Sequence, residues 1–485
     1  MGIKLTLLIV FFAVMVGVGL YSRKHTASVD GFVLGGRSVG PWLTAFAYGT
    51  SYFSAVVFVG YAGQFGWKYG IASTWIGIGN AVIGSLMAWV VLGRRTKVMT
   101  QHLGSKTMPD FFGERYGSKA LKIMASAIVF VFLVPYTASI YNGLSRLFEM
   151  AFHIPYAYCV AGMAVFTGIY VILGGYMATA INDFIQGIIM LLGIVAVIAA
   201  VLSGQGGFLE AIRKMAEIPS DLPVTMGQPG AFTSFFGPDP WNLLGVIILT
   251  SLGTWGLPQM IGKFYAIKDE KSINTGTVIS TLFACVVAGG SYFLGGFGRL
   301  FDSSEIYDET GSVVFDSIVP HMLSSLPDLL IGIVVVLVLS ASMSTLASLV
   351  LTSSSTLTLD FLKDNVMKNM SEKKQIRWMQ FLVVFFIGLS VWIALDPSTF
   401  IAQLMGISWG ALAGAFLAPF LYGLYWKRVT RAAVWASFIT GVGITVSNLF
   451  LHYIVSPINA GAVAMIAGLV VVPLVSIITP KPEAK

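Results

Sequence analysis

A dense group of hydroxyl side chains lies inside an apolar stretch that spans residues 327–360. The group includes Ser344, Thr345 and Ser348, and it continues to a run of hydroxyl residues at 352–356. Ser344 and Ser348 are four residues apart, so they share one face of a helix. Neutral hydroxyl oxygens are hard ligands that suit a small alkali cation better than a soft metal. In the alternative interpretation, these side chains bond the backbone of their own helix or let neighbouring helices approach.

One acidic residue, Asp183, falls inside another apolar stretch, near the start of the predicted span 180–203. A carboxylate at mid-membrane costs at least about 2.5–3.5 kcal/mol and usually has a functional partner. Because Asp183 lies near the inner end of its span, it could instead be a solvated acid. It could also be stabilised by the dipole at a helix N-terminus.

Two apolar stretches contain residues that interrupt helices. The first reads Ala-Tyr-Gly-Thr-Ser-Tyr-Phe-Ser over 47–54, and the second contains Gly253, Gly256 and Pro258. Backbone groups freed at membrane depth must face protein or a cavity. Two broken helices five spans apart are expected from an inverted five-helix repeat that binds substrate and ion between the breaks. The other interpretation treats the glycines as packing sites and Pro258 as a kink.

Other chemistry is poorly represented in the sequence. There is no Walker loop and no His-Glu-x-x-His motif, and the five histidines form no close-spaced metal-binding pair. Cys159 and Cys285 lie in apolar runs and are interpreted as small packing residues. We therefore expect no enzyme, and transport driven by an ion gradient or passive transport.

The composition places these residues in a membrane. Of 485 residues, 56% are hydrophobic and 11% are charged, whereas soluble domains are about one quarter charged. Such a chain must turn apolar surface toward lipid, so we predict an all-α integral membrane protein that forms one transmembrane domain over 1–485. About thirteen spans are predicted, at 3–21, 41–66, 71–93, 120–150, 156–174, 180–203, 241–266, 275–299, 327–360, 376–395, 398–424, 430–452 and 458–478.

Charge along the predicted loops indicates the orientation. Basic residues gather in alternate loops, which include Arg94-Arg95, Lys263, Lys268 and Lys373-Lys374, and acidic residues gather in the others, above all at 302–316. The positive-inside rule then places the N-terminus outside and the C-terminus in the cytoplasm of a multi-pass cell-membrane protein. The net charge of +7 therefore reflects topology, and no nucleic-acid partner is expected.

Six short motifs follow one another in an order that is specific to one family. They are Leu34-Gly35-Gly36-Arg37-Ser38, Thr107-Met108-Pro109-Asp110-Phe111-Phe112, Gly174-Gly175-Tyr176 with Asn182-Asp183, Gly256-Leu257-Pro258, Met343-Ser344-Thr345 and Gly423-Leu424-Tyr425-Trp426-Lys427-Arg428. With them the sequence resembles the sodium/solute symporters over nearly its whole length. The resemblance implies a leucine-transporter-type core with a first repeat at 41–203 and a second at 241–424. An extra N-terminal helix at 3–21 and two C-terminal helices at 430–478 would be added to it.

The resemblance also implies an ion site. It assigns sodium to the backbone carbonyls of Thr50, Phe53 and Ala341 and to the hydroxyls of Ser344 and Thr345. Some members of the family hold a second sodium, for which Asp183, Ser344 and Ser348 match here. Ala347 stands where those members have another hydroxyl, so the pattern for a second ion is incomplete.

The same resemblance suggests the solute. The proline and pantothenate branches are the most similar, although Tyr52 replaces an aspartate of the proline branch and Thr250 and Thr254 replace its aromatics. We expect sodium symport of a small carboxylate-bearing solute, with proline first and pantothenate or a monocarboxylate as alternatives. A passive uniporter or channel is a further alternative, and no obligate protein partner is evident. The residues expected to line the solute pocket are Tyr52, Phe53, Tyr136, Thr254, Trp255 and Pro258.

Overall fold

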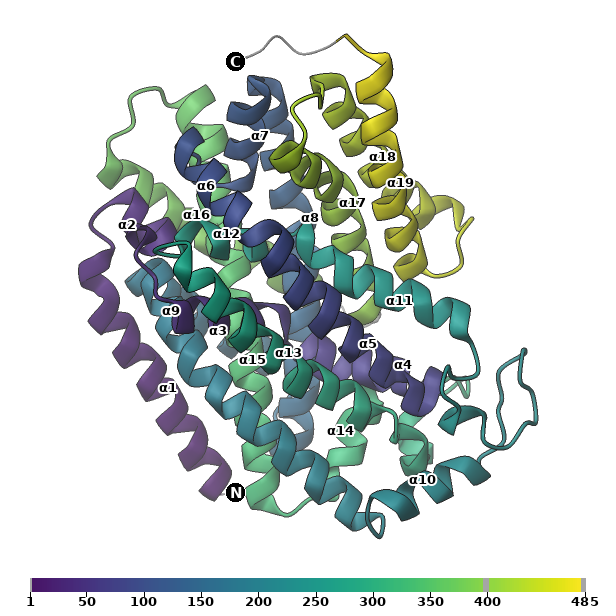
Figure 1. The fold of residues 1–485 in the computed structure, drawn as a ribbon. Helices are drawn as coiled ribbons and strands as arrows, with labels where there is room; N and C mark the ends of the chain where they lie inside the picture. The colour runs from purple at the N-terminus through teal and green to yellow at the C-terminus, as the bar shows by residue number, and fades with distance from the viewer. Residues whose placement is uncertain (1, 396–400, 481–485) are drawn as a thin grey trace.

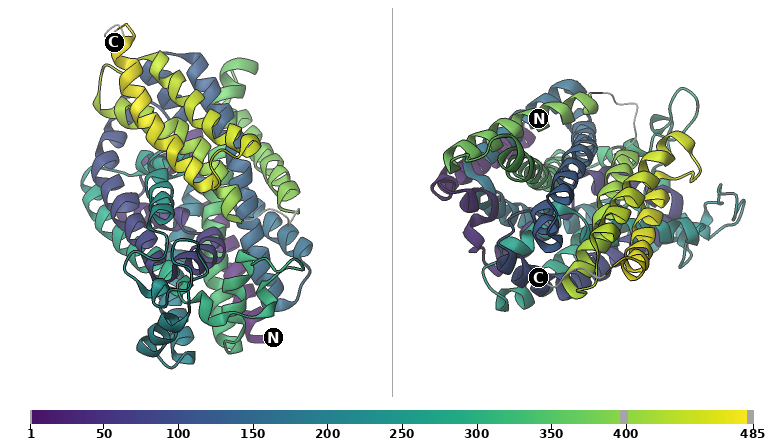
Figure 2. Two further views of the ribbon diagram at one scale, coloured as in Figure 1. Left: turned by 90° about the vertical axis from the view of Figure 1, so that its right-hand side faces the viewer. Right: turned by 90° about the horizontal axis from the view of Figure 1, so that it is seen from above.

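The protein is a bundle of helices, most of which run along its long axis (Figure 1). In the computed structural model, which describes residues 2–395 and 401–480, eleven helical segments are long and apolar enough to cross a membrane. This confirms the predicted all-α membrane architecture. The start of α1 and the end of α19 lie at opposite ends of the bundle, as both views along its side show (Figures 1 and 2).

The long helices form the transmembrane body. They are α1 (Gly2–Ser22), α8 (Lys119–Phe152), α9 (Tyr156–Gly204), α13 (Lys271–Gly295), α15 (Asp328–Thr356), α16 (Glu372–Ala394), α17 (Ile401–Tyr425), α18 (Arg431–Leu451) and α19 (Pro457–Ile478). The interrupted spans contain α3 (Pro41–Tyr52), η3 (Val56–Tyr61), α4 (Ala62–Tyr69), α5 (Thr74–Gly79), η5 (Asn80–Met87), η6 (Trp89–Gly93), α6 (Arg94–Leu103), α11 (Pro240–Leu252), η8 (Gly253–Trp255) and α12 (Pro258–Ala266). Shorter helices are α2 (Val29–Leu34), α7 (Met108–Tyr116), α10 (Phe208–Glu217) and α14 (Phe315–Ser324), and the π-helical η11 (Leu357–Val366) extends α15.

The first predicted break lies where α3 ends. Phe53 leaves helical geometry at φ −101° and ψ 127°, and helical structure resumes at Val56. Side-chain hydroxyls satisfy the freed backbone there, because Ser54 accepts from the Val56 N–H and Ser342 of α15 accepts from the Ala55 N–H, both at 3.2 Å. The break is therefore held by polar contacts inside the protein, as backbone at membrane depth requires.

The second predicted break separates α11 from α12. One turn of 3₁₀-helix follows α11, and Pro258 then opens α12 at a position where its missing N–H costs nothing. A β-carbon on Gly253 would lie 2.6 Å from the Trp409 ring, so glycine also allows α17 to pack closely against the break.

The predicted count of thirteen spans stays a prediction, because two of the eleven segments are too long for one crossing. They are 156–204, which is assigned as α9 and contains the predicted spans 156–174 and 180–203, and 56–103, which has 48 residues. A straight helix of 49 residues would extend about 70 Å, far beyond a bilayer core of about 30 Å. Gly175 interrupts α9 at φ 53° and ψ −147°, a conformation that only glycine adopts readily. The predicted span 398–424 corresponds to α17, and its first three residues lie outside the described residues.

Two helices form the centre of the bundle. In an apolar stretch of 18 residues within α17, 89% of the residues are buried. The corresponding share is 78% for the segment that contains α15 and 22% for the segment that contains α1. Helices α17, α18 and α19 pack side by side, and α1 lies on the opposite flank against α9 and α15 (Figures 1 and 2). The central position of α15 places its hydroxyl groups beside the break after α3.

Candidate functional site

The Thr345 hydroxyl of α15 faces the end of α3. Its oxygen lies 3.2 Å from the Thr50 carbonyl oxygen and 3.1 Å from the Phe53 carbonyl oxygen. It also lies 3.1 Å from the carbonyl oxygen of Ala341, four residues earlier in α15. Thr345 is fully buried, so these oxygens meet away from solvent.

This cluster contains more acceptors than hydrogens. A hydroxyl carries one hydrogen, so Thr345 donates to one of the three carbonyls at a time. If it bonds back to Ala341, as helical threonines commonly do, its oxygen faces the Thr50 and Phe53 carbonyls with no hydrogen between them. A cation relieves this arrangement, and hard neutral oxygens suit a small alkali ion. The residues present therefore fit sodium.

The remaining hydroxyl of the predicted sodium set lies beside the cluster. Ser344 donates to the Thr50 hydroxyl at 2.8 Å, and that hydroxyl donates to the Phe46 carbonyl at 2.8 Å. The structure thus brings together all five residues of this set, from two helices that are almost 300 positions apart in the chain. Their assignment to sodium stays a prediction.

The residues of the predicted second ion site surround a lysine. Ser348 lies 2.8 Å from the Ser51 hydroxyl and accepts a hydrogen bond of 3.0 Å from Lys263 Nζ. The ammonium lies 3.7 Å from a carboxylate oxygen of Asp183, and both side chains are almost fully buried. Asp183 is therefore neither solvated nor at a helix N-terminus, because it is fully buried and lies about two helical turns after the interruption at Gly175. The sequence-based placement of Lys263 in an inner loop is wrong, since it belongs to α12 within the broken span.

Two of the predicted pocket residues meet at an aromatic group that the sequence did not single out. The Tyr136 ring of α8 and the Tyr52 ring of α3 lie 5.8 Å and 6.0 Å from the Trp409 ring of α17. The Tyr52 hydroxyl donates to the Thr250 carbonyl at 3.0 Å, beside the second break. Neither the Tyr136 hydroxyl nor the Trp409 indole nitrogen has a hydrogen-bond partner among the described residues. Two buried donors are thus unused next to both breaks.

The other predicted pocket residues lie elsewhere. Thr254 donates to the Gly84 carbonyl at 3.1 Å and Trp255 donates to the Ile83 carbonyl at 2.9 Å, so both contact η5. The Phe53 side chain is buried, and its carbonyl belongs to the Thr345 cluster. The structure therefore does not gather the six residues around one point.

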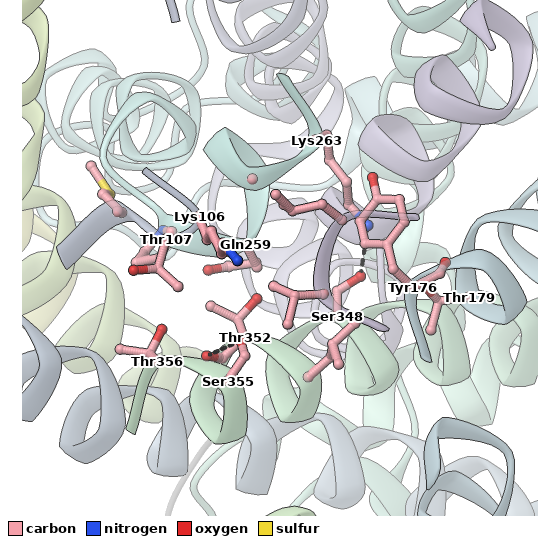
Figure 3. Close-up of a pocket in the computed structure, with 16 residues that line it drawn as sticks. Lys106, Thr107, Tyr176, Thr179, Gln259, Lys263, Ser348, Thr352, Ser355 and Thr356 are labelled. Atoms are coloured by element: carbon pink, nitrogen blue, oxygen red, sulfur yellow. Dashed lines mark hydrogen bonds between the residues drawn. The ribbon is translucent and has the colours of Figure 1, made fainter. Parts of the chain in front are cut away.

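Pro258 lines a small cavity of about 40 Å³ between α12 and α15. Hydroxyl groups of α15 and the side chains of Gln259 and Lys263 surround this cavity (Figure 3). Both polar atoms of the Gln259 amide are buried without a partner among the described residues. The cavity has both polar and apolar walls and has room for at least one water molecule.

Comparison with known proteins gives a consistent result for the sequence. The family model described as the sodium:solute symporter family matches residues 32–441. Sodium/proline symporter 2 of Staphylococcus saprophyticus is 30% identical over 451 residues, which cover 90% of this chain and 84% of that protein. A sodium/proline symporter of Staphylococcus aureus is 30% identical over 447 residues, which cover 89% and 83% of the two chains.

Solved structures share the fold. A Na⁺-coupled sialic acid symporter in a substrate-bound outward-open state superposes with a TM-score of 0.77 at 14% identity, over 99% of both chains. A nucleobase-cation-symport-1 family transporter reaches a TM-score of 0.50 at 12% identity, over 92% of this chain and 93% of that one. The family match over most of the length and the identity to these relatives show that the chain belongs to the sodium:solute symporter family and is a multi-pass membrane transporter coupled to sodium.

Proposed function

We propose that this transporter imports a small carboxylate-bearing solute together with sodium, and that proline is the first candidate. The observation that carries the proposal is the group of oxygens around Thr345, where one hydroxyl hydrogen faces three carbonyls. An ion at this place bridges the end of α3 to α15. Sodium then stabilises the arrangement of the broken helix that the solute requires, and the effect is reciprocal.

The unused donors beside Trp409 support the chemical class of the solute. The Tyr136 O–H and the Trp409 N–H are buried donors, and leaving such groups unpaired costs about 1–3 kcal/mol each. A carboxylate accepts hydrogen bonds from both and thereby offsets that cost. The rings of Tyr52, Tyr136 and Trp409 supply apolar contact for the rest of a small molecule.

The similarity to relatives named sodium/proline symporters supports proline as the first candidate. Tyr52 at the first break, where an aspartate is expected in the proline branch, keeps pantothenate and a monocarboxylate as the alternatives. All three solutes carry a carboxylate, so the donors alone do not separate them.

We propose further that the two broken helices belong to inverted repeats at 41–203 and 241–424, with the N-terminus outside and the C-terminus in the cytoplasm of the cell membrane. The start of α1 and the end of α19 lie at opposite ends of the bundle, which is the arrangement that an odd number of crossings produces (Figure 1). The charge asymmetry of the loops supports this direction.

Counterflow into proteoliposomes tests the solute. Vesicles loaded with unlabelled proline, pantothenate or a monocarboxylate receive the labelled compound outside, with sodium or with potassium alone. We expect sodium-dependent accumulation of one of them, proline first. Accumulation that is equal in sodium and potassium would identify a passive uniporter and overturn the proposal.

A further inference from the structure

The Lys263 ammonium is an unusual charge because it lies within a membrane-spanning segment. It belongs to α12, the second half of the broken span, and only 2% of the residue is exposed. Its environment is built from three other helices, since it contacts Ser348 of α15 and faces Asp183 and the Tyr176 ring of α9, while Ser348 also contacts Ser51 of α3. Figure 3 shows Lys263 reaching Ser348 across the cavity. A charge so deeply buried requires a partner, and it marks a functional site by default.

The ammonium takes the place at which a second sodium would have to bind. Of the three matching residues, Ser348 already accepts from Lys263, and Ser344 is directed to Thr50. Lys263 Nζ is 3.7 Å from Asp183, the one acidic side chain in this set. An ion that bound Asp183 and Ser348 would lie beside the ammonium, and like charges repel most strongly in a medium of low dielectric constant. The residues therefore do not fit a second sodium.

We propose that Lys263 is a built-in cation that replaces the second sodium, so that one sodium ion binds per chain. The inference rests on the proposed sodium site at Thr345. In this arrangement the charge of Asp183 is compensated whether or not sodium is bound, and α12 is tied permanently to α9 and α15. Only the contact between α3 and α15 then responds to the sodium concentration.

A purely structural ion pair is the competing interpretation, and the surroundings of Asp183 separate the two. Neither oxygen of the Asp183 carboxylate accepts a hydrogen bond of normal geometry from a described residue. The ammonium, at 3.7 Å, is therefore the group that compensates its charge. If the ammonium is removed, an unpaired carboxylate remains near the hydroxyls of Ser344 and Ser348. That set of oxygens is suited to a cation.

Counting bound ions tests the inference directly. Equilibrium binding of radioactive sodium to purified protein gives the number of sites per chain without any solute. We expect one site in the parent and in Lys263→Arg, two in Lys263→Met, and one in Lys263→Met/Asp183→Asn. Lys97→Met is the matched control, because Lys97 is also a 2% exposed lysine but donates to the Ile267 carbonyl, and it should keep one site.

The possible results lead to different conclusions. Two sites in the parent, with one lost in Asp183→Asn, would overturn the inference even if Lys263→Met could not be purified. One site in a monodisperse Lys263→Met protein would also overturn it and leave Lys263 a structural residue. No site in the parent would instead overturn the proposed sodium coupling through Thr345. The pattern of one, two and one across parent, single and double variant supports the inference.

Discussion

Replacement of Thr345 by alanine is the most direct test of the sodium site. The substitution removes a side-chain oxygen that lies within 3.2 Å of carbonyls from both the end of α3 and α15. Polar contacts to a charged group are worth about 1.5–3 kcal/mol each, and about 1.4 kcal/mol corresponds to a tenfold change in affinity. We therefore expect sodium to bind roughly 10- to 150-fold more weakly to Thr345→Ala. Thr345→Ser keeps the oxygen and should remain within a few-fold of the parent.

The assay is solute binding measured against sodium concentration for the parent and both variants. Coupling energies between sites are typically about 1–3 kcal/mol, so the solute affinity of Thr345→Ala should recover toward the parent value in saturating sodium. Thermal unfolding without sodium reports any loss of packing separately. If Thr345→Ala unfolds at a lower temperature but titrates with sodium like the parent, the hydroxyl is a packing residue and the proposed site is wrong.

Three other perturbations follow from the structure. Tyr136→Phe removes an unpaired buried hydroxyl and should weaken solute binding by about 1–3 kcal/mol. Tyr141→Phe removes a similarly buried and unpaired hydroxyl from the same helix and should leave solute affinity unchanged, and equal losses of affinity in the two variants would move the pocket away from Trp409. In a background without Cys159 and Cys285, an impermeant thiol reagent added outside should label Glu309→Cys but not Lys373→Cys, both exposed positions, and the reverse pattern would refute the orientation. Gly175→Ala should lower the free energy of unfolding by roughly 1–3 kcal/mol, because φ is positive there and the new β-carbon would lie 2.8 Å from the Phe32 carbonyl oxygen. Gly162→Ala in the same helix places its β-carbon in open space and is the control, and equal melting temperatures of the two variants would contradict the prediction.

The helices and their breaks were accessible from the sequence because their signals are local. Long apolar stretches predict spans, and the runs around Gly49 and Pro258 mark the interruptions that the structure contains after Tyr52 and Leu252. The Thr345 group was likewise accessible, since residues four apart share a face and the family resemblance supplied the partners on α3.

The contacts of Lys263 and Trp409 could not be predicted in the same way. A lysine at the end of an apolar stretch looks like a loop residue that reaches the membrane surface, and only the tertiary structure shows that its side chain reaches from α12 to Asp183 of α9. An aromatic residue in an apolar helix is ordinary, and Trp409 becomes distinctive only because two tyrosines from other helices meet it.

The shortage of hydrogens around Thr345 also bears on leakage across the membrane. In a carrier without sodium, the single hydrogen of the Thr345 hydroxyl can satisfy at most one of the two carbonyls at the end of α3, so close packing of α3 and α15 leaves an acceptor without a hydrogen. Separation of the helices admits water, whose hydrogens satisfy the same oxygens. If sodium binds here as proposed, a carrier that holds solute alone is disfavoured in the closed arrangement, and a penalty of about 1.4 kcal/mol lowers the closed population tenfold. The atoms proposed to bind the ion would then also limit uncoupled passage of the solute.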